Sequence, residues 1–99
     1  MNILQKLFGK KEVVDYKGLV QQGAIILDVR SKKEFEGGHI KSAINIPLDF
    51  AKLGNKNKII ITYCALGVRS GRATNILIAN GYSNVYNGGG LQSLQRKLL

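Results

Sequence analysis

The sequence predicts an α/β fold with a mostly parallel central sheet of about five strands and helices on both faces. Short apolar runs alternate along the chain with segments whose apolar residues recur at helical spacing, and this alternation is typical of parallel sheets. The run Ile59–Ile61 is continuously β-branched, as expected for a strand covered on both faces. The chain of 99 residues has the size of one domain with one hydrophobic core.

The expected domain spans residues 13–99, and residues 1–12 form a lead-in segment before it. Val13–Val14 is predicted to be a short edge strand. Asp15 follows as a helix N-cap, because a carboxylate accepts hydrogen bonds from the N–H groups of the first turn. A glycine ends this helix, and the apolar segment Ala24–Val29 is the next strand.

A second, short helix is predicted to begin after Ser31, which forms a capping box with Glu34. The pair Gly37–Gly38 ends this helix. Ile44–Ile46 is the next expected strand, and Pro47 closes it because proline cannot donate a hydrogen bond to a sheet ladder.

The connection to the central strand is expected to contain a helical turn at 48–53 and a polar turn at 54–58. The helix after the central strand is predicted to end at Asn80–Gly81. Its apolar residues recur at helical spacing: Ala73, Ile76 and Leu77.

The end of the chain is expected to form a last strand at Tyr82–Tyr86, a glycine loop at Asn87–Gly90 and a C-terminal helix. That helix packs through one apolar face: Leu91, Leu94 and Leu98.

Cys64 is the only cysteine, and it lies between the central strand and the start of a helix. Ligands bind at this edge of open α/β sheets. Backbone N–H groups of a tight loop and of a helix N-terminus favour an anion, and Gly67 permits such a turn. We therefore expect these groups, and Arg69 after them, to lower the pKa of the thiol and favour a reactive thiolate. A single cysteine excludes an intramolecular disulfide and a multi-cysteine metal site.

The loop Cys64-x-x-Gly67-x-Arg69-Ser70 resembles the active-site loop of rhodanese-like domains, a sulfurtransferase family. An upstream block is similar to the first-half signature of that family: Leu27-Asp28-Val29-Arg30, Glu34-Phe35, Gly38-His39-Ile40, Ala43 and Asn45-Ile46-Pro47. The resemblance covers roughly Val13 to Leu98. It implies a rhodanese-like fold and a sulfurtransferase of the thiosulfate:cyanide class.

In this family the cysteine accepts a sulfane sulfur, becomes a persulfide and passes the sulfur to a nucleophile. The resemblance therefore implies that Cys64 is the catalytic nucleophile and that no cofactor is needed beyond the covalent persulfide. The rest of the loop is expected to bind the substrate: Ala65, Leu66, Gly67, Val68, Arg69 and Ser70. Four upstream residues are expected to support the site structurally: Asp28, Arg30, Glu34 and His39. No metal ligand is expected.

Two of these residues have alternative roles. The Arg69 guanidinium suits either a substrate anion in the loop or a carboxylate, that of Glu34 or of Asp28. His39 could act as a general base for Cys64, as in cysteine hydrolases, but the resemblance favours a structural role. Arg72 is expected to face solvent.

Two other functions use a similar sequence. Rhodanese-like folds also serve as non-catalytic binding modules, usually with the cysteine lost. Cysteine phosphatases and arsenate reductases also hold a thiolate in an anion-binding loop, but the phosphatase loop has five residues between cysteine and arginine. Four residues separate Cys64 from Arg69, so this loop is tighter and suits a compact sulfur atom.

The formal net charge of +9 comes mainly from scattered lysines with little aromatic interleaving, which favours a solvated basic surface over a nucleic-acid-binding one. The expected partners are a small anionic or persulfide sulfur donor, a thiol or cyanide acceptor and an acidic sulfur-relay protein. Residues 1–11 resemble neither a signal peptide nor a membrane span. We expect a cytoplasmic monomer without stable membrane insertion, because a solitary thiol fits a reducing compartment.

Overall fold

The computed structural model describes residues 13–45 and 53–99. Its sheet contains four parallel strands in the order β2-β1-β3-β4. Their bounds are Ile25–Asp28 for β1, Ile44–Asn45 for β2, Ile60–Cys64 for β3 and Val85–Gly90 for β4. The predicted α/β class is confirmed, with four strands in the described residues rather than about five.

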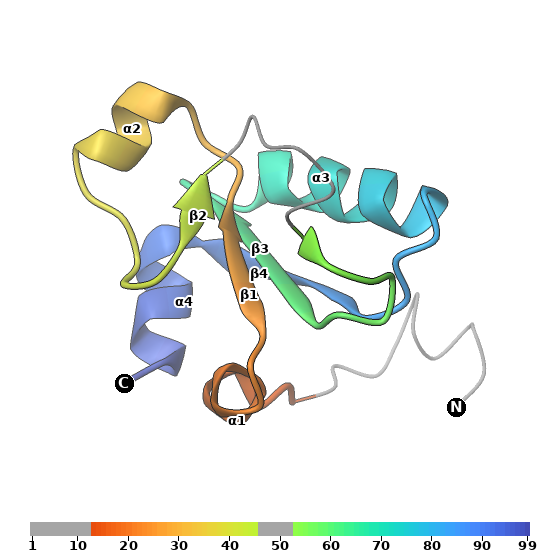
Figure 1. Cartoon of the computed structure of the whole chain (residues 1–99). Helices are drawn as coiled ribbons and strands as arrows, with labels where there is room; N and C mark the ends of the chain where they lie inside the picture. Colours follow the sequence, from red (N-terminus) through yellow and green to blue (C-terminus); the bar gives the residue numbers. More distant parts are fainter. Residues whose placement is uncertain (1–12, 46–52) are drawn as a thin grey trace.

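Helices cover both faces of this sheet (Figure 1). Their bounds are Tyr16–Gln21 for α1, Lys32–Glu36 for α2, Val68–Ala79 for α3 and Leu91–Lys97 for α4. Helix α3 packs on one face, whereas α1 and α4 pack on the other, so the core consists of two apolar layers separated by the sheet.

Strand β3 lies in the middle of the core, and all five of its residues are buried. Its side chains alternate between the two layers, as the pleat of a strand requires. Ile61 and Tyr63 pack with α1 and α4, whereas Ile60 and Cys64 pack with α3. The prediction that this strand is covered on both faces is therefore confirmed.

The predicted edge strand at Val13–Val14 is wrong. Val13 is 99% exposed, and the carbonyl of Val14 accepts a hydrogen bond from the N–H of Tyr16 at 3.1 Å. This segment is the entry to α1, where Asp15 caps the helix as predicted by accepting from the N–H of Gly18 at 2.9 Å. A short β-branched pair alone does not produce a strand, because it also needs a neighbouring strand to bond.

The second predicted cap is confirmed in full. Ser31 Oγ accepts from the N–H of Glu34 at 3.2 Å, and Glu34 Oε1 accepts from the N–H of Ser31 at 3.0 Å. Gly37 ends α2. The strand expected at 44–46 is present as β2, although Ile46 and most of the helical turn expected at 48–53 lie outside the described residues.

Helix α3 buries a partly polar face. Ser70, Thr74 and Leu77 face the sheet, whereas Ile76, one of the apolar residues that indicated the helix, is 56% exposed. The buried hydroxyls bond each other and the backbone: Thr62 Oγ1 lies 2.8 Å from Thr74 Oγ1 and donates to the Ser70 carbonyl at 3.2 Å. Their polarity is thus satisfied inside the core.

The last strand differs from the prediction in both bounds. Strand β4 begins at Val85 and runs through the glycines that were expected to form a loop. The reason is close packing. A Cβ atom on Gly88 would lie 2.8 Å from the carbonyl oxygen of Thr62 and 2.9 Å from Leu94 Cδ2. Only glycine allows β4 to lie between β3 and α4 at this distance.

We expect Gly88→Ala to reduce the free energy of unfolding by ~1–3 kcal/mol, because the added methyl overpacks the core. The control is Gly37→Ala, where φ is −77° and the nearest atom to a new Cβ is at 3.5 Å. The control should change stability by less than ~0.5 kcal/mol. Urea unfolding measures both variants, and equal stabilities would contradict the packing argument.

Candidate functional site

The carboxyl ends of three strands meet at one edge of the sheet, and Cys64 lies there at the end of β3. In the register of the sheet, Asp28 of β1 is opposite Tyr63, and Gly90 of β4 is opposite Cys64 after an irregularity in the ladder. Cys64 is 1% exposed and is a free thiol. The sulfur is therefore held at the base of the loop that leads to α3.

The loop turns its backbone toward the sulfur. The N–H of Gly67 donates to Cys64 Sγ at 2.9 Å, and the N–H of Ser70 donates to it at 3.4 Å. Gly67 has φ +102°, and a Cβ there would lie 3.4 Å from the Cα of Gly89. Glycine is required at this position for two reasons, the backbone conformation and the closeness of β4. The sequence predicted the first reason and not the second.

The Ser70 hydroxyl is the third group at the sulfur. Its Oγ is 3.5 Å from Cys64 Sγ, 3.0 Å from the carbonyl of Gly67 and 2.7 Å from Asn87 Oδ1. Asn87 is fixed in turn, because its Oδ1 accepts from the N–H of Gly89 at 3.0 Å. The sequence argument missed Asn87, which it placed in a loop. The one sequence signal was a polar residue directly before three glycines.

Burial of the sulfur raises the pKa of the Cys64 thiol. Hydrogen bonds from the Ser70 hydroxyl and from loop N–H groups outweigh burial and lower the pKa to about 7. These N–H groups belong to Ser70, Gly67 and Leu66. The direction agrees with the expectation from the sequence, but the hydroxyl, which that expectation omitted, is the largest of the lowering effects.

Arg69 pairs with a carboxylate and still lies close enough to Cys64 to interact with its charge. Its Nη1 and Nη2 donate to the two carboxylate oxygens of Glu34 at 2.7 and 3.0 Å. This bidentate pair connects the loop to α2 and, through the hydrogen bonds from Arg69, lowers the pKa of Glu34 to about 2. Because both side chains are exposed to solvent, the pair positions the loop more than it stabilises the fold.

A second ion pair is buried below the site. Arg30 Nη2 contacts Asp28 Oδ2 at 2.6 Å and donates to the carbonyl of Gly38 at 2.7 Å. Burial raises the pKa of Asp28, but hydrogen bonds from Arg30 and Tyr63 outweigh it and keep the pKa below its ordinary value. Asn45 of β2 donates to the carbonyls of both Asp28 and Arg30. This network fixes the end of β1 beside the loop.

His39 belongs to the region around α2. Its ring stacks on Phe35 with a centroid distance of 3.7 Å, and Nδ1 lies 2.8 Å from the Phe35 carbonyl. A carbonyl only accepts, so Nδ1 carries the proton. The hydrogen bonds of Cys64 within the described residues involve Gly67 and Ser70 and do not include His39.

The side chains of the loop form an exposed apolar rim. Leu66 is 90% exposed and Val68 is 67% exposed, while Arg72 is exposed on α3 as expected. Beside this rim lies an open cleft of about 480 Å³ between Ala65–Leu66 and the first residues of α4, with Arg30 and Arg96 in its wall. The cleft therefore borders the loop on the side of α4.

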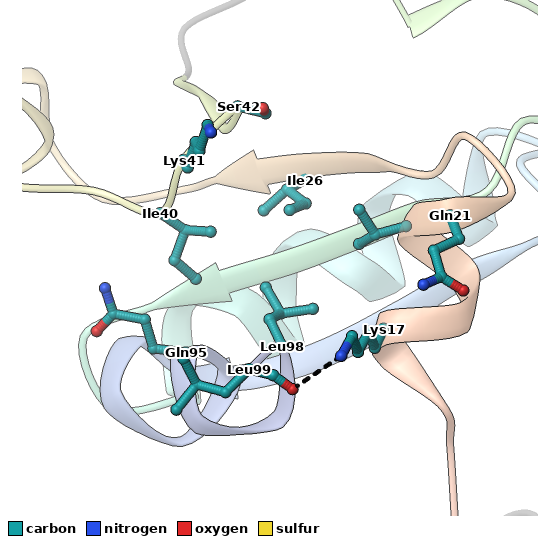
Figure 2. A pocket seen from close by; sticks show the side chains of 10 residues that line it. Lys17, Gln21, Ile26, Ile40, Lys41, Ser42, Gln95, Leu98 and Leu99 are labelled. Carbon is teal, nitrogen blue, oxygen red and sulfur yellow. Dashed lines mark hydrogen bonds between the residues drawn. The ribbon is translucent and has the colours of Figure 1, made fainter.

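A groove of similar size lies away from Cys64 (Figure 2). It occupies about 510 Å³ between α1, the turn at 40–42 and the end of α4, with Ile26 and Ile40 among its lining residues. At its edge, Lys17 Nζ donates to the carbonyl of Leu99 at 3.2 Å. None of the loop residues lines it, so it takes no part in the chemistry at the sulfur.

Within the part of the chain that the structure describes, no group of histidine, cysteine and carboxylate side chains is arranged to hold a metal ion. None of the helices in residues 13–45 and 53–99 has the length and apolar content needed to cross a membrane.

Known proteins resemble both the sequence and the fold. Protein YqhL of Bacillus subtilis, which is uncharacterized, is 48% identical over 69 residues, 65% of this chain and 54% of that protein. The thiosulfate sulfurtransferase PspE of Escherichia coli is 38% identical over 74 residues, 69% of this chain and 71% of that protein. The chain thus spans about half the length of YqhL and about seven tenths of the length of PspE.

A solved structure described as a rhodanese with anions from E. coli superimposes with a TM-score of 0.67 at 35% identity, covering 72% of this chain and 91% of that one. The family model of the rhodanese-like domain matches residues 4–97. With a parallel sheet, a cysteine at the end of β3 and a loop that turns its N–H groups onto the sulfur, the chain belongs to the family of rhodanese-like domains.

Proposed function

We propose that this chain is a sulfurtransferase that carries a sulfane sulfur on Cys64. The observation that supports it best is the set of hydrogen bonds on Sγ, from the N–H groups of Gly67 and Ser70 at 2.9 and 3.4 Å. These donors stabilise negative charge on the sulfur, both on the free thiolate and on the outer sulfur of a persulfide placed nearby. The similarity to the thiosulfate sulfurtransferase PspE supports the same activity.

The first step is a displacement at sulfur. The Cys64 thiolate attacks the sulfane sulfur of the donor, and a new S–S bond forms as the donor's own bond to that sulfur breaks. The leaving group takes the electron pair: sulfite leaves from thiosulfate, and a thiolate leaves from an organic persulfide. No proton has to move, because at neutral pH much of the thiol is already ionised with a pKa of about 7.

The second step returns the enzyme to its starting state. A nucleophilic acceptor, either a thiolate or cyanide, attacks the outer sulfur of the Cys64 persulfide. The S–S bond to Cys64 breaks, and its electron pair returns to Sγ, where the loop donors stabilise it. The net positive charge of the chain would also favour an acidic sulfur-relay protein as acceptor.

Ser70 supplies an adjustable donor for these steps. Its hydroxyl has one proton, and Asn87 Oδ1 at 2.7 Å is its nearest acceptor while Cys64 is a thiol. Oδ1 faces the hydroxyl because it also accepts from the N–H of Gly89. When the sulfur ionises, the hydroxyl proton can rotate toward Sγ at 3.5 Å and stabilise the new charge.

The geometry disfavours the cysteine phosphatase alternative. A phosphatase loop uses its arginine to bind the phosphate oxygens, but both terminal nitrogens of Arg69 donate to Glu34. The binding-module alternative is disfavoured by Cys64 itself, since a module without chemistry has no need of donors arranged around a sulfur.

The apolar rim bears on the choice of donor. Leu66 and Val68 place no charge near an incoming anion, and the charge of Arg69, which also acts on Cys64, is shared with Glu34. Thiosulfate would therefore bind mainly through backbone N–H groups and lack charge-assisted hydrogen bonds from an unpaired cation, which are worth ~1.5–3 kcal/mol each. We infer that a persulfide donor loads Cys64 faster than thiosulfate does.

Cys64→Ser should abolish sulfur loading and leave the fold unchanged, because Cys64 is the only cysteine in the sequence. Intact-protein mass spectrometry after incubation with thiosulfate or a persulfide should show one added sulfur on the wild type and none on the variant. Sulfur transfer by a folded Cys64→Ser protein would refute the proposal.

Ser70→Ala should raise the thiol pKa from about 7 toward the ordinary value of ~8.5, because the hydroxyl donor is lost. The rate of alkylation by iodoacetamide should then reach its midpoint at a higher pH than in the wild type. Ser83→Ala is the matched control, since that exposed hydroxyl bonds only the 56–57 turn. An unchanged midpoint in Ser70→Ala would show that the hydroxyl does not stabilise the thiolate.

Leu66→Lys should lower the KM for thiosulfate about tenfold or more, because it adds a cation beside the loop. The KM for a persulfide whose organic part is uncharged should stay the same. The control is Ile78→Lys, an exposed residue near the far end of α3. Saturation of the wild type at micromolar thiosulfate, or an unchanged KM for thiosulfate in Leu66→Lys, would contradict this role of the apolar rim.

A further inference from the structure

The cleft beside the loop is larger than a sulfur atom needs. It occupies about 480 Å³, and its walls come from two sides: Ala65 and Leu66 on one, and Gly90 with the first turns of α4 on the other. Both walls adjoin Cys64 through the backbone, because Ala65 follows Cys64 in the chain and Gly90 is opposite Cys64 in the sheet. A molecule in this cleft would therefore lie against the two residues that follow Cys64.

Two arginines line the cleft, and only one of them is neutralised by a carboxylate. The Arg30 guanidinium is 7% exposed and is neutralised by Asp28. Arg96 is exposed and has no ion pair with any carboxylate in the described residues. No aspartate or glutamate lines the cleft within that part of the chain. Arg96 is therefore the uncompensated positive charge of this surface.

The remaining lining residues are mixed in character. Leu66 is exposed at the rim and Leu91 is half-buried, so both offer apolar surface to methylene groups. Gln92 and Ser93 can bond amide or carboxylate groups. This combination suits a small organic molecule with a polar backbone and an anionic end, and it does not suit a bare inorganic ion.

The size of the cleft distinguishes thiosulfate from an organic persulfide. Arg96 follows Gly90 by six residues, which is ~9 Å of helical rise along the backbone. Thiosulfate has no organic part to occupy the space between Ala65 and Arg96, whereas the persulfide of a peptide-like thiol has one.

We propose that this cleft binds the organic part of a low-molecular-weight thiol persulfide and that Arg96 binds its carboxylate. The proposal rests on the proposed sulfurtransferase function and names the donor class of the same site. Arg96 acts as a specificity residue: it holds the far end of the donor, while the sulfur exchange takes place at Cys64 as described above.

The test compares three sulfur donors for Cys64. They are glutathione persulfide, whose organic part carries carboxylates, the persulfide of 2-mercaptoethanol, whose organic part is uncharged, and thiosulfate. Arg96→Ala should raise the KM for glutathione persulfide tenfold or more with little change in kcat. The KM for the other two donors should change less than twofold. Arg96→Lys should recover part of the loss, because it keeps the charge without the bidentate geometry.

The matched control is Arg72→Ala, which removes an exposed arginine that lies on α3 and does not line the cleft. This variant should change all three KM values only slightly and to the same extent, because it alters only the net charge of the protein. Equal changes for all three donors in Arg96→Ala, or no change for glutathione persulfide, would overturn the role of Arg96 while leaving sulfur transfer intact. Failure of every donor to add sulfur to the wild type would instead overturn the proposed function.

Discussion

Cys64 Sγ accepts hydrogen bonds from the N–H groups of Gly67 and Ser70, and this requires the chain to turn back on the sulfur within a few residues. Such a turn has two requirements. Gly67 must take φ +102°, and α3 must begin directly after it so that its first N–H groups point at the sulfur. The hydrogen bonds outweigh the burial of the thiol, so the site forms a thiolate near neutral pH without a histidine base.

The rest of the fold keeps this turn in place. Strand β4 approaches the loop so closely that a Cβ on Gly90 would lie 2.7 Å from the carbonyl oxygen of Ala65. Asn87, in the same strand, holds the Ser70 hydroxyl at 2.7 Å. On the other side of the loop, Glu34 binds Arg69. The loop is thus fixed by β4 and by α2, and it presents backbone donors to the sulfur of Cys64.

Local signals explain what the sequence could predict. The caps at Asp15 and Ser31, the buried run of β3 and the turn at Gly67 each depend on residues within a few positions of one another, so pattern and propensity were enough. The position of Cys64 followed from the strand and helix on either side of it. The family resemblance added the chemistry that these elements support.

The features that the sequence did not predict depend on contacts between distant residues. The partner of Arg69 is 35 positions away, and both a carboxylate and a substrate anion suit a guanidinium. The glycines of β4 disfavour a strand by propensity, but Gly88 packs against Thr62 and Leu94 and Gly90 packs against Ala65 more closely than a side chain would allow. Likewise, Ser70 and Thr74 face the core because Thr62 and Asn87 satisfy their hydroxyl groups.

The most direct test of this account is a pH titration of the unmodified protein, following the ultraviolet absorbance of the thiolate against Cys64→Ser as the blank. We expect a single inflection near pH 7, because the loop hydrogen bonds lower the pKa of Cys64 to about 7. An inflection at or above the ordinary thiol value of ~8.5 would contradict it, since burial would then outweigh the hydrogen bonds on the sulfur.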